Sequence, residues 1–183
     1  MIFIETELKG AYLIELEKKA DERGFFARAW CSNEFQAHNL PSRFAQCNIS
    51  WNKRKGTLRG MHRQRAPHEE NKLIRCTRGA IYDVILDLRP DSSTFGKWLG
   101  FELTEENHRS LFVPGGFAVG FQTLRDESEV FYLMSECYTP GAEEGVRYND
   151  PSFGFEWPTD VTVISEKDTN WPDYHGILPP KDG

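Results

Sequence analysis

Hydrophobic positions occur along most of the chain in short runs that Gly, Pro, Asn and Asp interrupt. Runs of strand length with this punctuation are typical of an all-β sandwich or barrel, whereas an α/β protein alternates its strands with long helical segments. The sequence therefore predicts an all-β fold, a jelly-roll barrel with extensions. The ten predicted strands span residues 11–17, 24–30, 44–51, 58–64, 72–77, 80–88, 97–103, 110–113, 117–123 and 129–136.

The polarity of the two faces distinguishes two of these strands. In 80–88, large apolar residues alternate with Asp83 and Asp87, which is the period-2 pattern of a half-buried strand with one face against the core. In 129–136, apolar side chains point to both faces, so both faces are expected to be covered. A second subunit or the chain's own termini can cover the outer face.

Helix is predicted only in short peripheral pieces. Ser32 is expected to cap a short helix that runs through His38, and 104–108 are expected to form a further turn. Length and pattern favour a single jelly-roll domain over 1–183. The tail after Pro158 is rich in Pro, Asp, Lys and Trp, and its last residues are expected to be loosely held.

Composition limits the possible classes of function. Hydrophobic residues make up 39% of the chain and aromatic residues 13%, which is enough to fill a core. A formal charge of −6 repels a phosphate backbone, so nucleic-acid binding is not expected. No apolar run approaches the roughly 20 residues of a membrane span, and the first residues do not resemble a secretory signal. A cytoplasmic protein without a membrane span is therefore expected.

His62 is the first candidate for chemistry. Histidine titrates near neutral pH without perturbation, which suits a general base, but a core or surface histidine with a satisfied hydrogen bond is the alternative. Arg59 can bind a phosphate and Lys72 can stabilise an oxyanion, although single charges on strands are also common at solvated surfaces. Strict alternation puts Arg59 and His62 on opposite faces, so a shared pocket requires a bulge or turn at Gly60.

Two tyrosines each have two interpretations. Tyr132 is either a core residue with a satisfied hydroxyl group or a proton donor. Tyr138, close to Pro140, either packs in a turn or offers a flat surface on which a base stacks. The pattern alone favours packing for both.

A metal site is not expected. A metal-dependent enzyme on a barrel of this kind needs three histidines and a carboxylate around one ion. His62 is followed by Arg63 and Gln64, and the segment 114–119 ends in Val119 instead of a further histidine. The remaining histidines are scattered, and the four cysteines form no CxxC pair, so they are expected to stay reduced. The sequence thus predicts neither a metal nor another cofactor.

Ten segments together resemble one enzyme family over nearly the whole chain. They span residues 21–26, 46–48, 58–62, 72–76, 79–87, 93–96, 113–118, 149–151, 156–158 and 165–168. In these segments the chain resembles the dTDP-4-dehydrorhamnose 3,5-epimerase family, whose members are cupin-like jelly-roll homodimers acting on nucleotide-linked 4-keto-6-deoxysugars. The resemblance implies the same fold, a homodimer and a nucleotide-sugar substrate for this chain.

The resemblance also implies roles for individual residues. His62 would be the base that removes the proton beside the ketone, and Asp168 the carboxylate that orients its ring. Tyr132 would return a proton from the other face of the sugar, and Lys72 would lie near the ketone oxygen. Arg23 and its neighbours would reach into the partner subunit's pocket. The positions matched to contacts with nucleotide or sugar are Arg23, Phe26, Arg28, Gln46, Asn48, Arg59, Val119, Tyr138, Glu143 and Lys167.

Two positions depart from the pattern that the resemblance implies. Val119 stands where the family usually carries a histidine, which makes that part of the pocket apolar. Arg28 stands where a glutamate is common, which reverses the charge near the expected nucleotide end. We hypothesise that the sugar, the base or the set of inverted carbons differs from that of the standard 3,5-epimerase.

Three functions are compatible with these residues. The first is an epimerase that inverts C3, C5 or both. The second is a nucleotide-sugar 3,4-ketoisomerase, which moves the ketone on a similar barrel. The third is a non-catalytic sugar-binding barrel, which the joint presence of His62, Tyr132, Asp168 and Lys72 disfavours.

Overall fold

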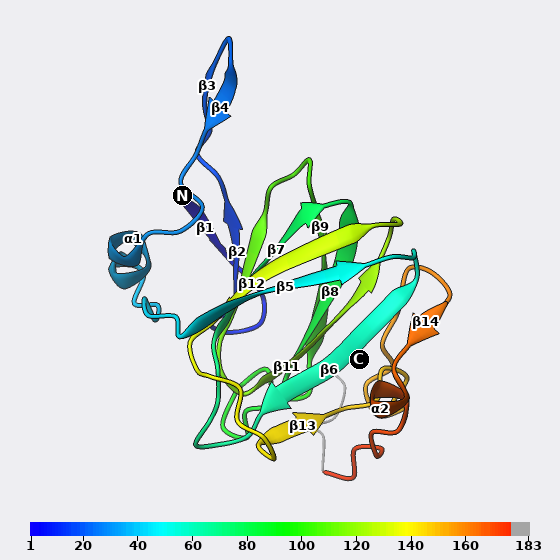
Figure 1. Ribbon diagram of the computed structural model, residues 1–183. Helices are drawn as coiled ribbons and strands as arrows, with labels where there is room; N and C mark the ends of the chain where they lie inside the picture. The colour runs from blue at the N-terminus through cyan, green and yellow to red at the C-terminus, as the bar shows by residue number, and fades with distance from the viewer. Residues whose placement is uncertain (177–183) are drawn as a thin grey trace.

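Two β-sheets face each other and enclose the core in the computed structural model, which describes residues 1–176 (Figure 1). Neighbouring strands within the ordered path of each sheet are antiparallel. The first sheet has the order β1 (Ile2–Glu5), β2 (Tyr12–Glu15), β10 (Ser110–Val113), β7 (Lys72–Arg78), β12 (Ser128–Met134) and β5 (Gln46–Asn52). The second has the order β13 (Glu143–Gly145), β6 (Thr57–Gln64), β11 (Phe117–Thr123), β8 (Ala80–Asp87) and β9 (Trp98–Thr104), and β14 (Val163–Ile164) joins β6 in parallel. This arrangement confirms the predicted all-β jelly-roll barrel.

Every predicted strand has a counterpart, and most of the ends shift. The prediction is least accurate for 24–30, where β4 (Gly24–Phe26) ends early and pairs with β3 (Lys19–Asp21) in a separate hairpin. β1, β3, β13 and β14 were not predicted. β3, β13 and β14 are three residues long or shorter, so alternation of polarity cannot identify them, and pairing with a neighbour defines them instead.

Apolar side chains from both sheets fill the space between them. Ile74 and Val130 come from the first sheet, and Ile81, Ile85 and Val119 come from the second. All five are at least nine-tenths buried. Burial of a side chain of this size stabilises the fold by about 1.5–3 kcal/mol, so the two sheets hold each other in place around the barrel interior.

The prediction that β8 is half-buried is wrong, because both of its faces are covered. Asp83 and Asp87 are both 0% exposed. They point the same way as the interior residues of β8, while Val84 and Leu86 on the other face pack beneath Phe153 of the C-terminal segment. The acidic face therefore lies toward the barrel interior and not toward solvent.

The strand β12 is apolar on both faces, as predicted, but its two faces are covered to different degrees. Val130 and Met134 are buried, whereas Phe131 and Leu133 on the outer face are half-buried. With Trp30 and neighbouring side chains, Phe131 and Leu133 line an apolar pocket of about 380 Å³. Within the described chain, the outer face of this sheet is thus only partly covered.

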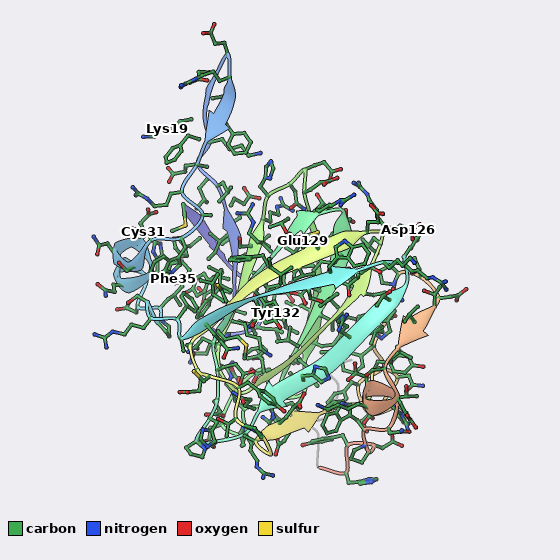
Figure 2. The ribbon with its side chains drawn as sticks, viewed as in Figure 1. Lys19, Cys31, Phe35, Asp126, Glu129 and Tyr132 are labelled. Atoms are coloured by element: carbon green, nitrogen blue, oxygen red, sulfur yellow. The ribbon has the colours of Figure 1, made fainter. Side chains whose placement is uncertain are left out.

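Two short helices lie at the periphery (Figure 1), and the first of them was predicted. α1 (Ser32–Ala37) carries the fully buried Phe35, which Figure 2 labels. The prediction that Ser32 caps this helix is wrong: Cys31 is at the N-cap, with no side-chain cap hydrogen bond. In 104–108, the predicted turn is present, since the N–H of His108 donates to the carbonyl of Thr104 at 3.2 Å.

The C-terminal segment contains a helix that was not predicted. α2 (Glu166–Thr169) begins after Ser165, whose hydroxyl group accepts a hydrogen bond from the Asp168 N–H at 3.1 Å. The loosely held end that the sequence predicts falls on 177–183, outside the described residues. No helix in residues 1–176 is long and apolar enough to cross a membrane.

Candidate active site

A cavity of about 870 Å³ lies between the two sheets. The four side chains predicted to be catalytic all line it, namely His62, Lys72, Tyr132 and Asp168. Seven of the ten predicted substrate-binding residues line it as well, and these are Gln46, Asn48, Arg59, Val119, Tyr138, Glu143 and Lys167. Residues spread over more than a hundred positions of sequence therefore converge on one cavity.

The predicted base and acid come from opposite walls of this cavity. His62 lies on β6 of the second sheet, and Tyr132 lies on β12 of the first. Figure 2 labels Tyr132 near the centre of the two-sheet body. A flat ring held between the sheets can thus meet an imidazole on one side and a phenol on the other.

His62 and Asp168 form a hydrogen-bonded pair. The Nε2 atom of His62 lies 2.5 Å from Oδ1 of Asp168, and the N–H of Gly60 donates to Oδ2 at 3.4 Å. Burial alone would raise the pKa of Asp168, but these hydrogen bonds hold it below its ordinary value, so the carboxylate is ionised. An ionised acceptor at Nε2 places a proton on that nitrogen and leaves Nδ1 as the basic nitrogen.

An irregularity at Gly60 brings Arg59 and His62 to the same cavity. These two residues are three positions apart on β6, yet they pair with residues of β11 that are two positions apart. Gly60 has φ +124°, and a Cβ atom there would lie 2.4 Å from the Cα of Gly120. Only glycine fits this conformation and this close approach. The bulge that was predicted as a condition for a shared pocket is present.

Lys72 is held at the cavity wall by two contacts. Its Nζ lies 2.9 Å from Oε1 of Glu70 and donates to the carbonyl of His62 at 3.3 Å. The side chain of Glu70 is 4% exposed, so this is a buried ion pair. Because an ammonium group has three donors, Lys72 can also donate to an oxygen atom inside the cavity.

The phenol of Tyr132 can donate a proton. Burial raises its pKa above the ordinary value, and the positive charge of Arg59 opposes this only in part. The phenol is therefore protonated at neutral pH.

The residues at the cavity rim are more exposed and carry charge. Lys167 forms an ion pair with Glu143, and this contact raises the pKa of Lys167. The side chain of Tyr138 is exposed, and the backbone N–H of this residue donates to Oε1 of Gln46 at 3.2 Å. Together with Asn48 on β5, this rim offers a cation, an open aromatic ring and amide groups to a polar ligand.

Three predicted substrate-binding residues do not line the cavity of their own chain. Arg23 and Phe26 are exposed on the β3–β4 hairpin, which projects away from the sheets in Figure 1. Arg28, in the segment after the hairpin, pairs with Glu34 at 3.1 Å. Whether these residues reach the pocket of a partner subunit, as the resemblance implies, stays a prediction.

Three residues that line the cavity or contact His62 were not predicted. Glu70 could have been inferred, since it lies two positions before Lys72 and so on the same face of an extended chain. Asp83 lines the cavity, but its alternation with apolar residues suggested an exposed face. Trp171, whose ring lies 6.2 Å from the imidazole of His62, follows Asp168 closely, but no local pattern points to this contact.

Metal ligands do not gather anywhere in the described part of the chain. In residues 1–176 there is no group of three or more His, Cys, Asp or Glu side chains that could hold an ion.

Comparisons with known proteins agree on one family. A family model described as dTDP-4-dehydrorhamnose 3,5-epimerase matches residues 5–175. An enzyme of that name from Methanothermobacter thermautotrophicus is 45% identical over 92% of this chain and 92% of its own length. The crystal structure of another, from Bacillus anthracis with TDP and PPi bound, has a TM-score of 0.91 at 40% identity and covers 94% of this chain and 99% of that one.

A relative that inverts a single carbon is also similar. ChmJ, a 3'-monoepimerase from Streptomyces bikiniensis whose structure holds dTDP-quinovose, has a TM-score of 0.85 at 32% identity. The match covers 92% of this chain and 85% of that one. The chain is thus similar both to proteins described as 3,5-epimerases and to one described as a 3'-monoepimerase.

Proposed function

Because the chain belongs to the dTDP-4-dehydrorhamnose 3,5-epimerase family, we propose that it inverts C3, C5 or both in a nucleotide-linked 4-keto-6-deoxyhexose. The protein is an isomerase, and its substrate is of the dTDP-4-dehydro-6-deoxyglucose type used in dTDP-rhamnose biosynthesis. The observation that supports the residue assignment is the placement of His62 and Tyr132 on opposite walls of one cavity.

The proposed reaction is a proton transfer through an enolate. Nδ1 of His62 takes the proton from the carbon beside the ketone. The electron pair of that C–H bond forms the C=C bond of the enolate, and the π electrons of the C=O bond move onto the ketone oxygen. Lys72 stabilises the resulting negative charge, and preorganised donors of this kind are worth several kcal/mol. Asp168 stabilises the imidazolium that forms.

Inversion requires that the new proton arrive from the other face of the ring. Tyr132 donates its phenolic proton to the same carbon, and the electron pair of the enolate forms the new C–H bond while the ketone returns. The phenolate and the imidazolium then exchange protons with solvent, which restores both groups. A single residue would return the proton to the face from which it came, so the reaction needs both walls of the cavity.

We assign the nucleotide to the rim of the cavity. Arg59 and Lys167 supply positive charge for a diphosphate, and Tyr138 supplies an exposed ring on which a base can stack. Glu143 holds Lys167 at the edge, and Gln46 and Asn48 offer amide groups to the sugar or base.

Isotope exchange tests the proposed function. In D2O, an epimerase incorporates deuterium at C3, C5 or both and leaves the ketone at C4. A ketoisomerase gives a product whose ketone has moved to C3, and a non-catalytic barrel gives no exchange. A panel of 4-keto sugar nucleotides examined by NMR separates these outcomes, and the position of the deuterium shows which carbons react.

We propose that the protein is a homodimer formed through the outer face of the first sheet. Ile49 is 64% exposed and lies opposite Phe131, next to the apolar pocket on that face. Phe26, on the projecting hairpin, is 71% exposed. Exposed apolar surface of this kind marks an interaction site. In a dimer, the hairpin of each chain reaches toward the pocket of the other.

Replacing Ile49 with aspartate is expected to separate the dimer into single chains, because the contact would bury an unpaired charge. Light scattering after size-exclusion chromatography measures the mass. Val163→Asp is the matched control, since Val163 is also exposed and apolar but lies on β14 of the other sheet. A wild-type protein with the mass of one chain, or a dimer that survives Ile49→Asp, would refute the proposal.

Replacing Val119 with histidine is expected to change the turnover or the ratio of C3 to C5 exchange on dTDP-4-keto-6-deoxyglucose. Val119 lies opposite His62 in the β11–β6 register and is 8% exposed, so an imidazole there would add a polar group to the wall beside the base. Product analysis by NMR measures both quantities. If neither activity nor product changes, Val119 does not determine specificity.

A further inference from the structure

Asp83 is a buried carboxyl group without a hydrogen-bond partner. Its side chain is 0% exposed, lines the cavity, and has no partner for either carboxylate oxygen among the described residues. Burial of an unpaired charge is costly, and a buried polar group without a partner requires an explanation. Asp87, four residues along the same face, is equally buried but accepts hydrogen bonds from Arg89, Ser92 and Thr94.

The surroundings of Asp83 contain little that would stabilise a negative charge. Its register partners on β11 and β9 are Phe121 and Phe101, which are uncharged. From the opposite sheet, Lys72 acts on Asp83 electrostatically, but its ammonium group is already paired with Glu70. The other charged or titratable groups that line the cavity are Arg59, His62 and Arg63 on β6, Tyr132 on β12, Tyr138, Glu143 on β13, and Lys167 and Asp168 on α2.

We propose that Asp83 holds a proton in the active enzyme and is a positioning residue for Lys72. A neutral Asp83 leaves the ammonium group of Lys72 balanced by Glu70 alone and free to meet the ketone oxygen. An ionised Asp83 would add a second carboxylate beside the same ammonium group, draw it toward the cavity wall and oppose the charge that develops on the enolate. This proposal rests on the proposed epimerase function.

The electrostatics of the site agree with this role. Burial raises the pKa of Asp83 from 3.8 to about 8, and the positive charge of Lys72 lowers it only in part. The carboxyl group therefore keeps its proton at neutral pH and loses it in mildly alkaline solution. The reaction rate should then decline by up to about tenfold per pH unit above that value, because only neutral Asp83 leaves Lys72 free to meet the ketone oxygen.

Thermal stability tests the protonation state without any substrate. Between pH 4 and pH 8, Asp83 is ionised in the unfolded chain but keeps its proton in the folded chain. The contribution of this group to the free energy of unfolding therefore decreases as the pH rises through this range. Asp83→Asn removes that dependence and keeps the size of the side chain. The melting temperature of Asp83→Asn minus that of the wild type is expected to increase from pH 5 to pH 8.

Asp87→Asn is the matched control on the same strand. Burial alone would raise the pKa of Asp87, but hydrogen bonds from Arg89, Ser92 and Thr94 hold it below its ordinary value. Its ionised form therefore stabilises the fold throughout this range. Asp87→Asn is expected to lower the melting temperature at pH 5 and at pH 8 by similar amounts. A melting difference for Asp83→Asn that stays constant or shrinks with rising pH would overturn the proposal.

The pH profile of deuterium exchange tests the link to Lys72. The wild type is expected to lose exchange activity above about pH 8, whereas Asp83→Asn, which stays neutral, should keep its activity flat through that region. An alkaline decline that is unchanged in Asp83→Asn would refute the positioning role. If the wild type shows no exchange with any 4-keto sugar nucleotide, the epimerase proposal itself fails, and the melting experiment still decides whether Asp83 is neutral.

Discussion

His62→Ala is expected to lower the rate of deuterium exchange by between about 10²- and 10⁴-fold, the range that a positioned general base contributes. Among residues 1–176, no other histidine lines the cavity to take the proton beside the ketone. The side chain of His62 is 30% exposed, so its loss should leave the fold intact. Exchange at C3 and C5 in D2O, followed by NMR, measures the effect.

His68→Ala is the control for this substitution. His68 lies in the loop after β6, close to Thr139 and outside the lining of the cavity, so exchange should remain at the wild-type rate. Wild-type exchange in folded His62→Ala would show that another group removes the proton. The circular dichroism spectrum and the melting temperature of both variants establish that they are folded.

Tyr132→Phe is expected to separate exchange from inversion. His62 can still remove a proton and return a deuteron to the same face, so exchange should persist while formation of the inverted product falls by between about 10²- and 10⁴-fold. The ring is retained, so packing against the interior cluster should change little. Measuring deuterium content and product stereochemistry in the same sample gives both rates.

Tyr12→Phe removes the same hydroxyl group from a tyrosine that packs in a separate cluster on the first sheet. It should affect neither exchange nor inversion. If exchange and inversion fall together in Tyr132→Phe, Tyr132 serves proton removal as well. If neither falls, the second acid is another residue.

The sequence pattern predicts the strands well because each strand is bounded by residues that end it. It fails where burial depends on distant segments. Asp83 illustrates this. Alternation correctly places Asp83 and Val84 on opposite faces of β8, but the C-terminal segment around Phe153 covers the apolar face that contains Val84, and the face that contains Asp83 lies toward the barrel interior. No local pattern contains that information.

The candidate site shows the same limit. Strict alternation places Arg59 and His62 on opposite faces of the strand. From the sequence we could predict only that Gly60 must interrupt the regular strand if both residues belong to one pocket. Asp168 was matched through the family resemblance, since it lies 106 positions from His62 and on a helix of four residues. The reach of Arg23 and Arg28 into the pocket of a second chain stays a prediction, because it concerns an assembly of two chains.

The separation of His62 from Asp168 also bears on how activity arises during protein synthesis. The amino-terminal part of a chain emerges from the ribosome first, and chains fold progressively as they emerge. Strands β5 to β12 are complete before residue 135, whereas α2 begins only at Glu166. A nascent chain can therefore close its barrel around an imidazole that still lacks its carboxylate. We therefore expect the His62–Asp168 pair to form only after residues 166–169 have emerged and docked beside β6.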